Sequence, residues 1–263
     1  MAKVRQRTYT RLMGLYDRGY MHEPARGRGF GFSLAGISIT GWLIGINVAV
    51  FLVDRLLQRA GWSYVLFQGP AVVGQFGVLE LWGHFSVSTA VKSYQVWRFL
   101  TFQFLHADLE HLIFNMLSLF FFGPIVESYL GARRFLPFYL LCGIGGVAMY
   151  LILWMVGLRS FPDWVPLVGA SAGIFGILIA AARVAPSATV MFMMIFPMPL
   201  RTLAWLFIAY AIWSVISKGQ NAGGEAAHLG GAAVGWLLMH RPGVLDRLML
   251  PKMGGGRFRG TGL

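Results

Sequence analysis

The chain has 263 residues, of which 57% are hydrophobic and only 12% are charged. When Gly is counted as apolar and Tyr is left out, the apolar share is about 67%, against roughly 45–50% apolar and about 25% charged residues in soluble domains. This composition excludes a soluble domain, a disordered chain and a collagen-like chain, and the single cysteine, Cys142, excludes a disulfide scaffold. A polytopic membrane protein remains.

Six apolar segments follow one another along the chain, each a candidate for a membrane-spanning helix. They are residues 37–53, 109–124, 135–157, 167–183, 200–217 and 226–239. Asp108 precedes the second segment and is a favourable N-cap residue. Only ten residues separate Pro186 from Pro197, too few to span as a helix, so we expect a re-entrant or interfacial connection there. The sequence therefore predicts an all-α bundle of six transmembrane helices with a long interfacial first loop, residues 57–104, rich in aromatic residues.

Basic residues indicate the orientation of these spans. The formal net charge is +12, and 12 of the 22 Lys and Arg residues lie in the two ends of the chain. With six spans, 16 basic residues would lie on the side of the two termini and 6 on the other, so both termini are expected in the cytoplasm. We expect basic tails at 1–36 and 241–263, a membrane domain at 37–240, the cell (inner) membrane as location and no nucleic-acid partner. An Arg-rich N-terminal segment also fits a mitochondrial presequence, which is the alternative.

Polar side chains inside predicted spans are costly and mark candidate functional sites. His111 and Asn115 lie in the second span, Ser171 in the fourth and His228 in the sixth, while His106 precedes the second. These three spans all enter the membrane from outside, and each polar residue lies early in its span. We therefore expect a hydroxyl and an imidazole at one depth, in the outer third of the bilayer.

The spacing of these residues leaves structural and functional alternatives open. His111 and Asn115 are four residues apart and project from one helix face. Ser171 lies in a G-x-S-x-G pattern, and Gly231 and Gly235 follow His228 as a G-x-x-x-G face; both patterns are also typical of close helix packing. Three histidines could hold zinc, but there is no H-E-x-x-H pattern and no carboxylate in the predicted spans of Ser171 and His228, so we expect neither metal nor cofactor.

Together, these motifs resemble the rhomboid family of intramembrane serine proteases over roughly residues 38–240. The order of the motifs relative to the spans carries the resemblance more than any one of them. They are Trp97-Arg98, then His106, His111 and Asn115 as H-x-x-x-x-H-x-x-x-N, then Gly123, Glu127 and Gly131, then Gly169-Ala170-Ser171, and finally Ala227-His228 with Gly231 and Gly235.

The resemblance implies a Ser–His dyad without a third carboxylate, acting on single-span or polytopic membrane-protein substrates in the bilayer. Ser171 would be the nucleophile and His228 the general base. His111, Asn115 and the Ser171 amide would form the oxyanion hole.

Several further residues would support this site. Phe175 would stack on the histidine, His106 would bond the loop above the site, and Gly169 opens the serine motif. Trp97-Arg98 would prop the loop at the lipid boundary. Glu127 would be a structural partner on the inner side, pairing with Arg133 or Arg134.

One departure from the family pattern, Ala172 where many members have Gly, leaves the approach to the oxyanion hole in doubt. The alternative function is a non-catalytic rhomboid-like protein that binds transmembrane segments. A small transporter is disfavoured because the chain shows neither internal repeats nor charged residues near the middle of the predicted spans.

Overall fold

The computed structural model describes residues 36–68, 71–157, 162–192, 195–241 and 243–248. The chain divides into two units, Met1–Ile37 and Ser38–Leu263, and the helices and strands below belong to the second. The predicted basic tails, residues 1–36 and 241–263, lie outside the described residues except for positions 36, 241 and 243–248.

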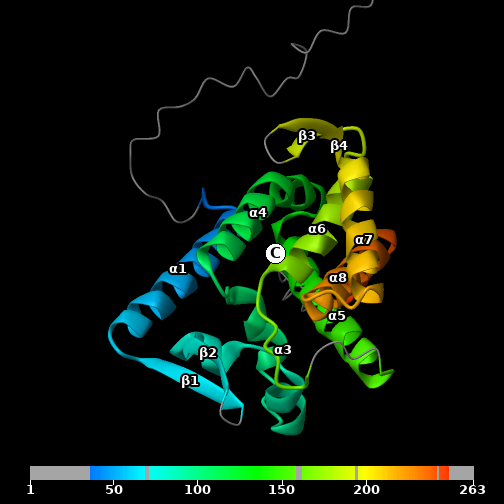
Figure 1. Cartoon of the computed structure of the whole chain (residues 1–263). Coiled ribbons are helices and arrows are strands. Elements are labelled where there is room, and N and C mark those ends of the chain that lie inside the picture. The colour runs from blue at the N-terminus through cyan, green and yellow to red at the C-terminus, as the bar shows by residue number, and fades with distance from the viewer. Residues whose placement is uncertain (1–35, 69–70, 158–161, 193–194, 242, 249–263) are drawn as a thin grey trace, which may run out of the picture. The chain divides into compact units, whose positions relative to one another are not determined.

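Six helices coincide with the six predicted apolar segments (Figure 1). They are α1 (Ile39–Arg59), α4 (Leu109–Leu130), α5 (Ala132–Met155), α6 (Ser171–Val184), α7 (Leu200–Ile216) and α8 (Ala222–His240). By length and composition, α1, α4 and α5 can each cross a membrane, while α6 and α7 are apolar but only 14 and 17 residues long. The chain is thus a mostly helical membrane protein.

Side-chain caps explain where two of the long helices begin. The Asp108 carboxylate accepts a hydrogen bond from the amide of His111 at 2.7 Å, which confirms the predicted N-cap of α4. Ser38 caps α1 through the amide of Gly41 at 3.0 Å. Between α4 and α5, Gly131 has a φ of +79° and lets the chain reverse after a single residue.

Glu127 joins α4 to the start of α1. Its carboxylate accepts hydrogen bonds from the amides of Ile39 and Thr40, at 2.8 and 2.9 Å. The predicted pairing of Glu127 with Arg133 or Arg134 was wrong, because the free amides of the α1 first turn hold the carboxylate instead. Arg134 pairs with Asp246 of the short helix α9 (Gly243–Leu248), at 2.7 Å.

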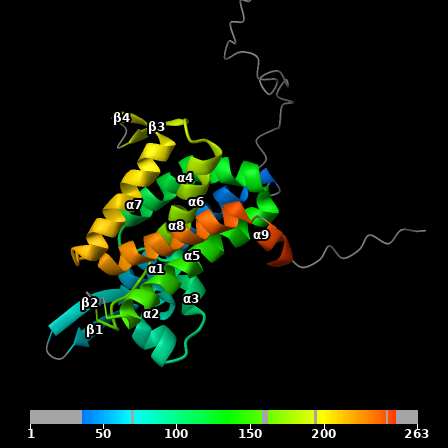
Figure 2. The same ribbon diagram turned by 90° about the vertical axis from the view of Figure 1, so that its right-hand side faces the viewer.

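The structure is mostly helical, as expected, but it also contains two β-hairpins that an all-α fold would lack. Strands β1 (Ser63–Gln68) and β2 (Ala71–Gly77) pair in the first loop, and β3 (Thr189–Phe192) pairs with β4 (Phe196–Pro199) where a re-entrant or interfacial connection was expected. Proline is tolerated in β4 because each strand of a two-stranded hairpin is an edge strand. Figures 1 and 2 show the two hairpins at opposite ends of the helices.

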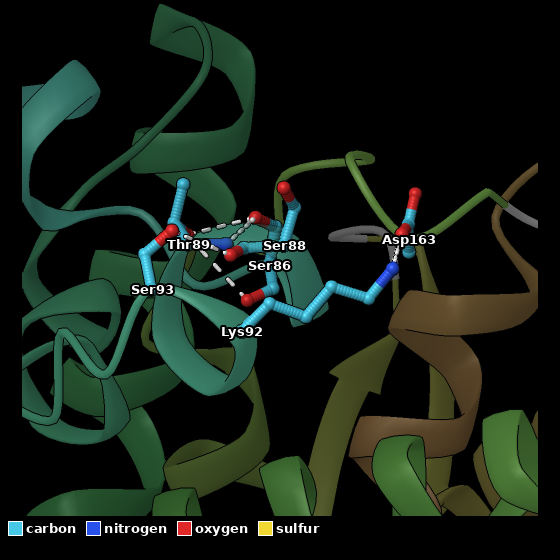
Figure 3. A network of polar contacts seen from close by, with 6 residues as sticks. All are labelled: Ser86, Ser88, Thr89, Lys92, Ser93 and Asp163. Carbon is cyan, nitrogen blue, oxygen red and sulfur yellow. Dashed lines mark hydrogen bonds and ion pairs between the residues drawn. The ribbon is translucent and has the colours of Figure 1, made fainter.

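Short helical turns fill the rest of the first loop. They are α2 (Val78–Gly83), the π-helical turn η3 (Val87–Lys92), α3 (Arg98–Thr101) and the 3-10 turn η4 (Phe102–Phe104). Ser86 caps η3 through Thr89, and Lys92 forms an ion pair with Asp163 of the segment between α5 and α6 (Figure 3). Polar contacts therefore attach the first loop to the segment that leads into α6.

Glycines bring α8 into backbone contact with α5 and α6, and we call this contact the glycine seam. A β-carbon on Gly230 would collide with the carbonyl oxygen of Gly145, and one on Gly231 with that of Ala172. A β-carbon on Gly235 would lie 2.6 Å from the Cα of Gly176. The predicted G-x-x-x-G packing face is confirmed. Figure 2 shows α8 lying along α5 and α6.

Candidate active site

Ser171 is the first residue of α6, and the residues before it shape its surroundings. Gly169 has a φ of +126°, a backbone conformation that residues other than glycine rarely adopt. A β-carbon at position 169 would lie 2.7 Å from Nε2 of His111 and 3.5 Å from Oγ of Ser171. The amides that begin α6 have no intrahelical acceptor, so they are available to donate hydrogen bonds to a bound group.

His228 comes from α8 and meets Ser171 across the glycine seam. Its Nε2 lies 2.8 Å from the Ser171 hydroxyl, although the two residues are 57 positions apart in the sequence. Phe175, one turn after the serine, stacks on the imidazole with ring centroids 4.1 Å apart and planes 8° from parallel. Ala172 directly follows Ser171, and Gly231 lies three residues after His228. The close contact between Gly231 and Ala172 therefore holds α6 and α8 in the position that brings the imidazole to the hydroxyl.

Glu225 is the residue that the sequence interpretation missed. Its Oε2 lies 2.8 Å from Nδ1 of His228, and its side chain is only 7% exposed. The expectation of no nearby carboxylate was wrong because α8 begins at Ala222, four residues before the predicted start of the span. Glu225 and His228 are therefore three apart on one helix face. The Glu-x-x-His spacing, with Asn221 as N-cap, was the available signal.

His111 and Asn115 lie on α4, which packs against α6. The Asn115 side chain is buried, and its Nδ2 has no hydrogen-bond partner among the described residues. His111 reaches Gly169 with its Nε2, as the position of the hypothetical β-carbon shows. Two side chains that can donate hydrogen bonds thus belong to the helix beside the serine.

His106 is buried just before α4, and its ring packs edge-on against His111 with centroids 5.0 Å apart. Burial, assisted by His111, lowers the pKa of His106 to about 3, so the ring is neutral at physiological pH. Neither ring nitrogen has a hydrogen-bond partner within the described ranges, so the expected bond to the loop above the site is not formed by the ring.

Trp97 and Arg98 organise the first loop. The Arg98 guanidinium donates to the carbonyl of His84 at 2.7 Å and to the Gln95 side chain at 2.6 Å, and burial lowers its pKa. The Trp97 indole donates to the carbonyl of Trp82 at 3.0 Å, while the ring is half exposed. These two residues hold loop backbone and make no described hydrogen bond to Ser171 or His228.

Sequence comparison identifies the family. The Rhomboid domain matches residues 93–241, more than half of the chain, and the match includes every polar residue of the site. The chain belongs to the rhomboid family. Among the described residues, no group of three or more His, Cys, Asp or Glu side chains is placed to hold a metal ion.

Relatives in this rhomboid family include named proteases and a protein named inactive. The chain is 29% identical to Rhomboid protease AarA of Providencia stuartii, over 79% of this chain and 73% of that protein. It is 30% identical to the mitochondrial RHOMBOID-like protein 12 of Arabidopsis thaliana, over 67% of this chain. It is also 30% identical to Inactive RHOMBOID-like protein 8 of the same plant, over 47% of this chain. The chain spans 60% and 33% of the lengths of the two plant proteins.

Proposed function

We propose that this rhomboid-family protein is a serine endopeptidase that hydrolyses peptide bonds in or beside transmembrane helices of membrane-protein substrates. The contact that carries the proposal is the 2.8 Å approach of Ser171 Oγ to His228 Nε2. A hydroxyl and an imidazole at hydrogen-bond distance, with a parallel aromatic ring fixing the imidazole, form an activated nucleophile.

The chemistry runs in two halves. In the first, Ser171 Oγ attacks the scissile carbonyl carbon while its proton passes to Nε2 of His228. The tetrahedral intermediate collapses, the C–N bond breaks, and Nε2 returns the proton to the leaving amine. In the second, His228 takes a proton from water, the hydroxide attacks the acyl ester, and the proton returns to Ser171 as the acid product leaves.

The oxyanion of each tetrahedral intermediate needs donors that are already in place. We assign this role to the Ser171 amide, His111 and the Nδ2 of Asn115. Support comes from the unpartnered, buried Nδ2 and from the closeness of His111 to Gly169. One such donor is worth about 2.7–4 kcal/mol of transition-state stabilisation. Among the supporting residues, Phe175 orients the imidazole, Gly169 keeps the approach open, His106 packs behind His111, and Trp97 and Arg98 hold the first loop.

The proposed topology has six spans, with both basic tails (1–36 and 241–263) in the cytoplasm and the site opening outward from the membrane domain at 37–240. The correspondence of six helices with six apolar segments and the distribution of basic residues support it. A substrate helix has all its backbone groups bonded, so it must unwind locally before its carbonyl reaches Ser171. We place the protein in the cell inner membrane; the resemblance to a mitochondrial relative makes a mitochondrial membrane the alternative.

A fluorophosphonate probe and a reporter transmembrane substrate test the function together. Purified protein should react with the probe and cleave the reporter, and Ser171→Ala and His228→Ala should lose both activities while keeping the wild-type unfolding midpoint. Asn115→Ala should retain probe labelling and cut at a rate reduced about 10²-fold or more. Equal labelling of wild type and Ser171→Ala would overturn the assignment of the nucleophile.

A non-catalytic protein that binds transmembrane segments is the second candidate, favoured by the resemblance to a relative named inactive. That function requires binding of the reporter helix with no cleavage and no probe labelling by the wild-type protein. The same purified samples therefore separate the two candidates.

A further inference from the structure

We propose that Glu225 acts as a positioning residue for His228, so that the site works as a Ser–His–Glu triad and not as a dyad. The inference rests on the proposed peptidase function. It assigns a role to a side chain that the dyad mechanism does not use, and it starts from the contact of Glu225 Oε2 with His228 Nδ1 at 2.8 Å.

The two nitrogens of His228 have different partners, and the difference selects a tautomer. An ionised carboxylate can only accept hydrogen bonds, so Glu225 requires the proton of the neutral imidazole to be on Nδ1. The lone pair of Nε2 then faces the Ser171 hydroxyl, 2.8 Å away. This is the tautomer that a general base needs, because Nε2 must receive the serine proton.

Burial gives the carboxylate a second effect. The side chains of Glu225 and His228 are 7% and 14% exposed, so water screens their interaction weakly. When Nε2 takes the serine proton, an imidazolium forms beside the carboxylate, and the attraction between the two charges favours the charged intermediate. Besides His228, Glu225 contacts Asn221, whose Nδ2 lies 3.5 Å from Oε1.

A different role for Glu225 would be helix stabilisation alone. Acidic residues in a first helical turn interact favourably with the helix dipole, and Glu225 occupies the first turn of α8. Glu110 occupies the first turn of α4 but is exposed and has no described contact with a catalytic residue. Glu110→Gln is therefore the matched control for Glu225→Gln, because both changes remove one charge from a helix N-terminus.

The rate experiment uses the full-length protein in a lipid bilayer with a reporter transmembrane substrate. Glu225→Gln should lower kcat by about 10²- to 10⁴-fold with KM within about twofold of wild type, as expected for a lost triad carboxylate. Glu225→Asp should recover part of this loss, and Glu110→Gln should cleave at the wild-type rate. A Glu225→Gln variant with wild-type kcat would overturn the proposal.

A spectroscopic experiment tests the contact independently of cleavage. In protein labelled with ¹⁵N-histidine, the Nδ1-bound proton of His228, assigned through His228→Ala, should give a low-field resonance that shifts upfield or disappears in Glu225→Gln and persists in Glu110→Gln. Absence of an Nδ1-bound proton in wild type, or an unchanged resonance in Glu225→Gln, would overturn the proposal. If wild type fails to react with the fluorophosphonate probe, the peptidase function itself fails, which this spectrum distinguishes from a failure of the Glu225 contact.

Discussion

The glycine seam and the first loop, which connects α1 to α4, hold neighbouring parts of the chain by different interactions. In the seam, helix backbones touch, and a β-carbon on Gly231 would meet a carbonyl oxygen. In the first loop, side chains donate hydrogen bonds to backbone carbonyls. Arg98 donates to the carbonyl of His84, and Thr101 donates to the carbonyl of Gly83. The seam should therefore respond to side-chain volume, and the loop to the loss of charge or of a donor.

Ser171 and His228 come from the two helices of the seam that face each other across Ala172 and Gly231. Their separation is thus set by backbone contact, which has few alternative arrangements. The first loop instead supplies packing and a polar attachment through Lys92 and Asp163. The reactive pair is built on the part of the fold that tolerates the least displacement.

The largest effect is expected from added volume in the seam. Gly231→Leu should abolish the native fold, since the new side chain has only backbone to displace. Ala233→Leu, an exposed position on the same helix, is the control and should leave thermal unfolding within about 0.5 kcal/mol of wild type. The measurement is thermal unfolding in detergent. A folded, active Gly231→Leu protein would show that the seam can separate.

A smaller effect is expected from a lost donor in the loop. Arg98→Ala leaves the buried carbonyl of His84 and the Gln95 side chain without their partner and should destabilise the protein by about 2–4 kcal/mol. Limited proteolysis should then cut first within the loop between α1 and α4. Arg59→Ala, which removes an exposed charge, should digest like wild type. If both variants digest alike, the loop does not depend on the Arg98 contacts.

The smallest effect is a pH dependence that arises in the loop. Burial, with Asp54 adding to it and Arg55 opposing it, raises the pKa of Glu80 to about 7. A raised carboxyl pKa means that the folded state binds the proton more tightly, so this stabilisation is full below about pH 4.5 and is lost as pH rises through about 7.

Glu80→Gln should therefore remove part of the fall in the unfolding midpoint between pH 5 and pH 8, a difference of a few degrees or about 1 kcal/mol. Glu110→Gln should keep the wild-type profile. Parallel pH profiles for wild type and Glu80→Gln would refute the raised pKa.

Parts of the fold followed from local sequence, and the rest depended on tertiary contacts. The apolar segments located the six helices, and Asp108 marked the start of α4. The early positions of Ser171 and His228 in their spans anticipated their approach. Short strands such as β3 give a weak periodic signal, so both hairpins were missed.

Two carboxylates show why the remainder was not predictable. Predicting the contact of Glu225 with His228 required knowing where α8 begins. Helix boundaries read from sequence alone are in error by a few residues. Glu127 bonds to amides 87 and 88 positions away, on a helix whose placement no local pattern reveals. In both cases the missing information was which backbone or ring a carboxylate reaches after folding.

Cys142 is the single cysteine of the chain, and its thiol is fully buried on α5, where a β-carbon on Gly176 would collide with it. A thiol reagent can therefore modify the wild-type protein at one site only, Cys142. The reaction requires α5 and α6 to move apart. The rate of that reaction reports how often α5 separates from α6, the helix that carries the reactive serine, during turnover. A cysteine introduced on the surface would be the first to be labelled, so distances across the bundle can be measured without removing a native residue.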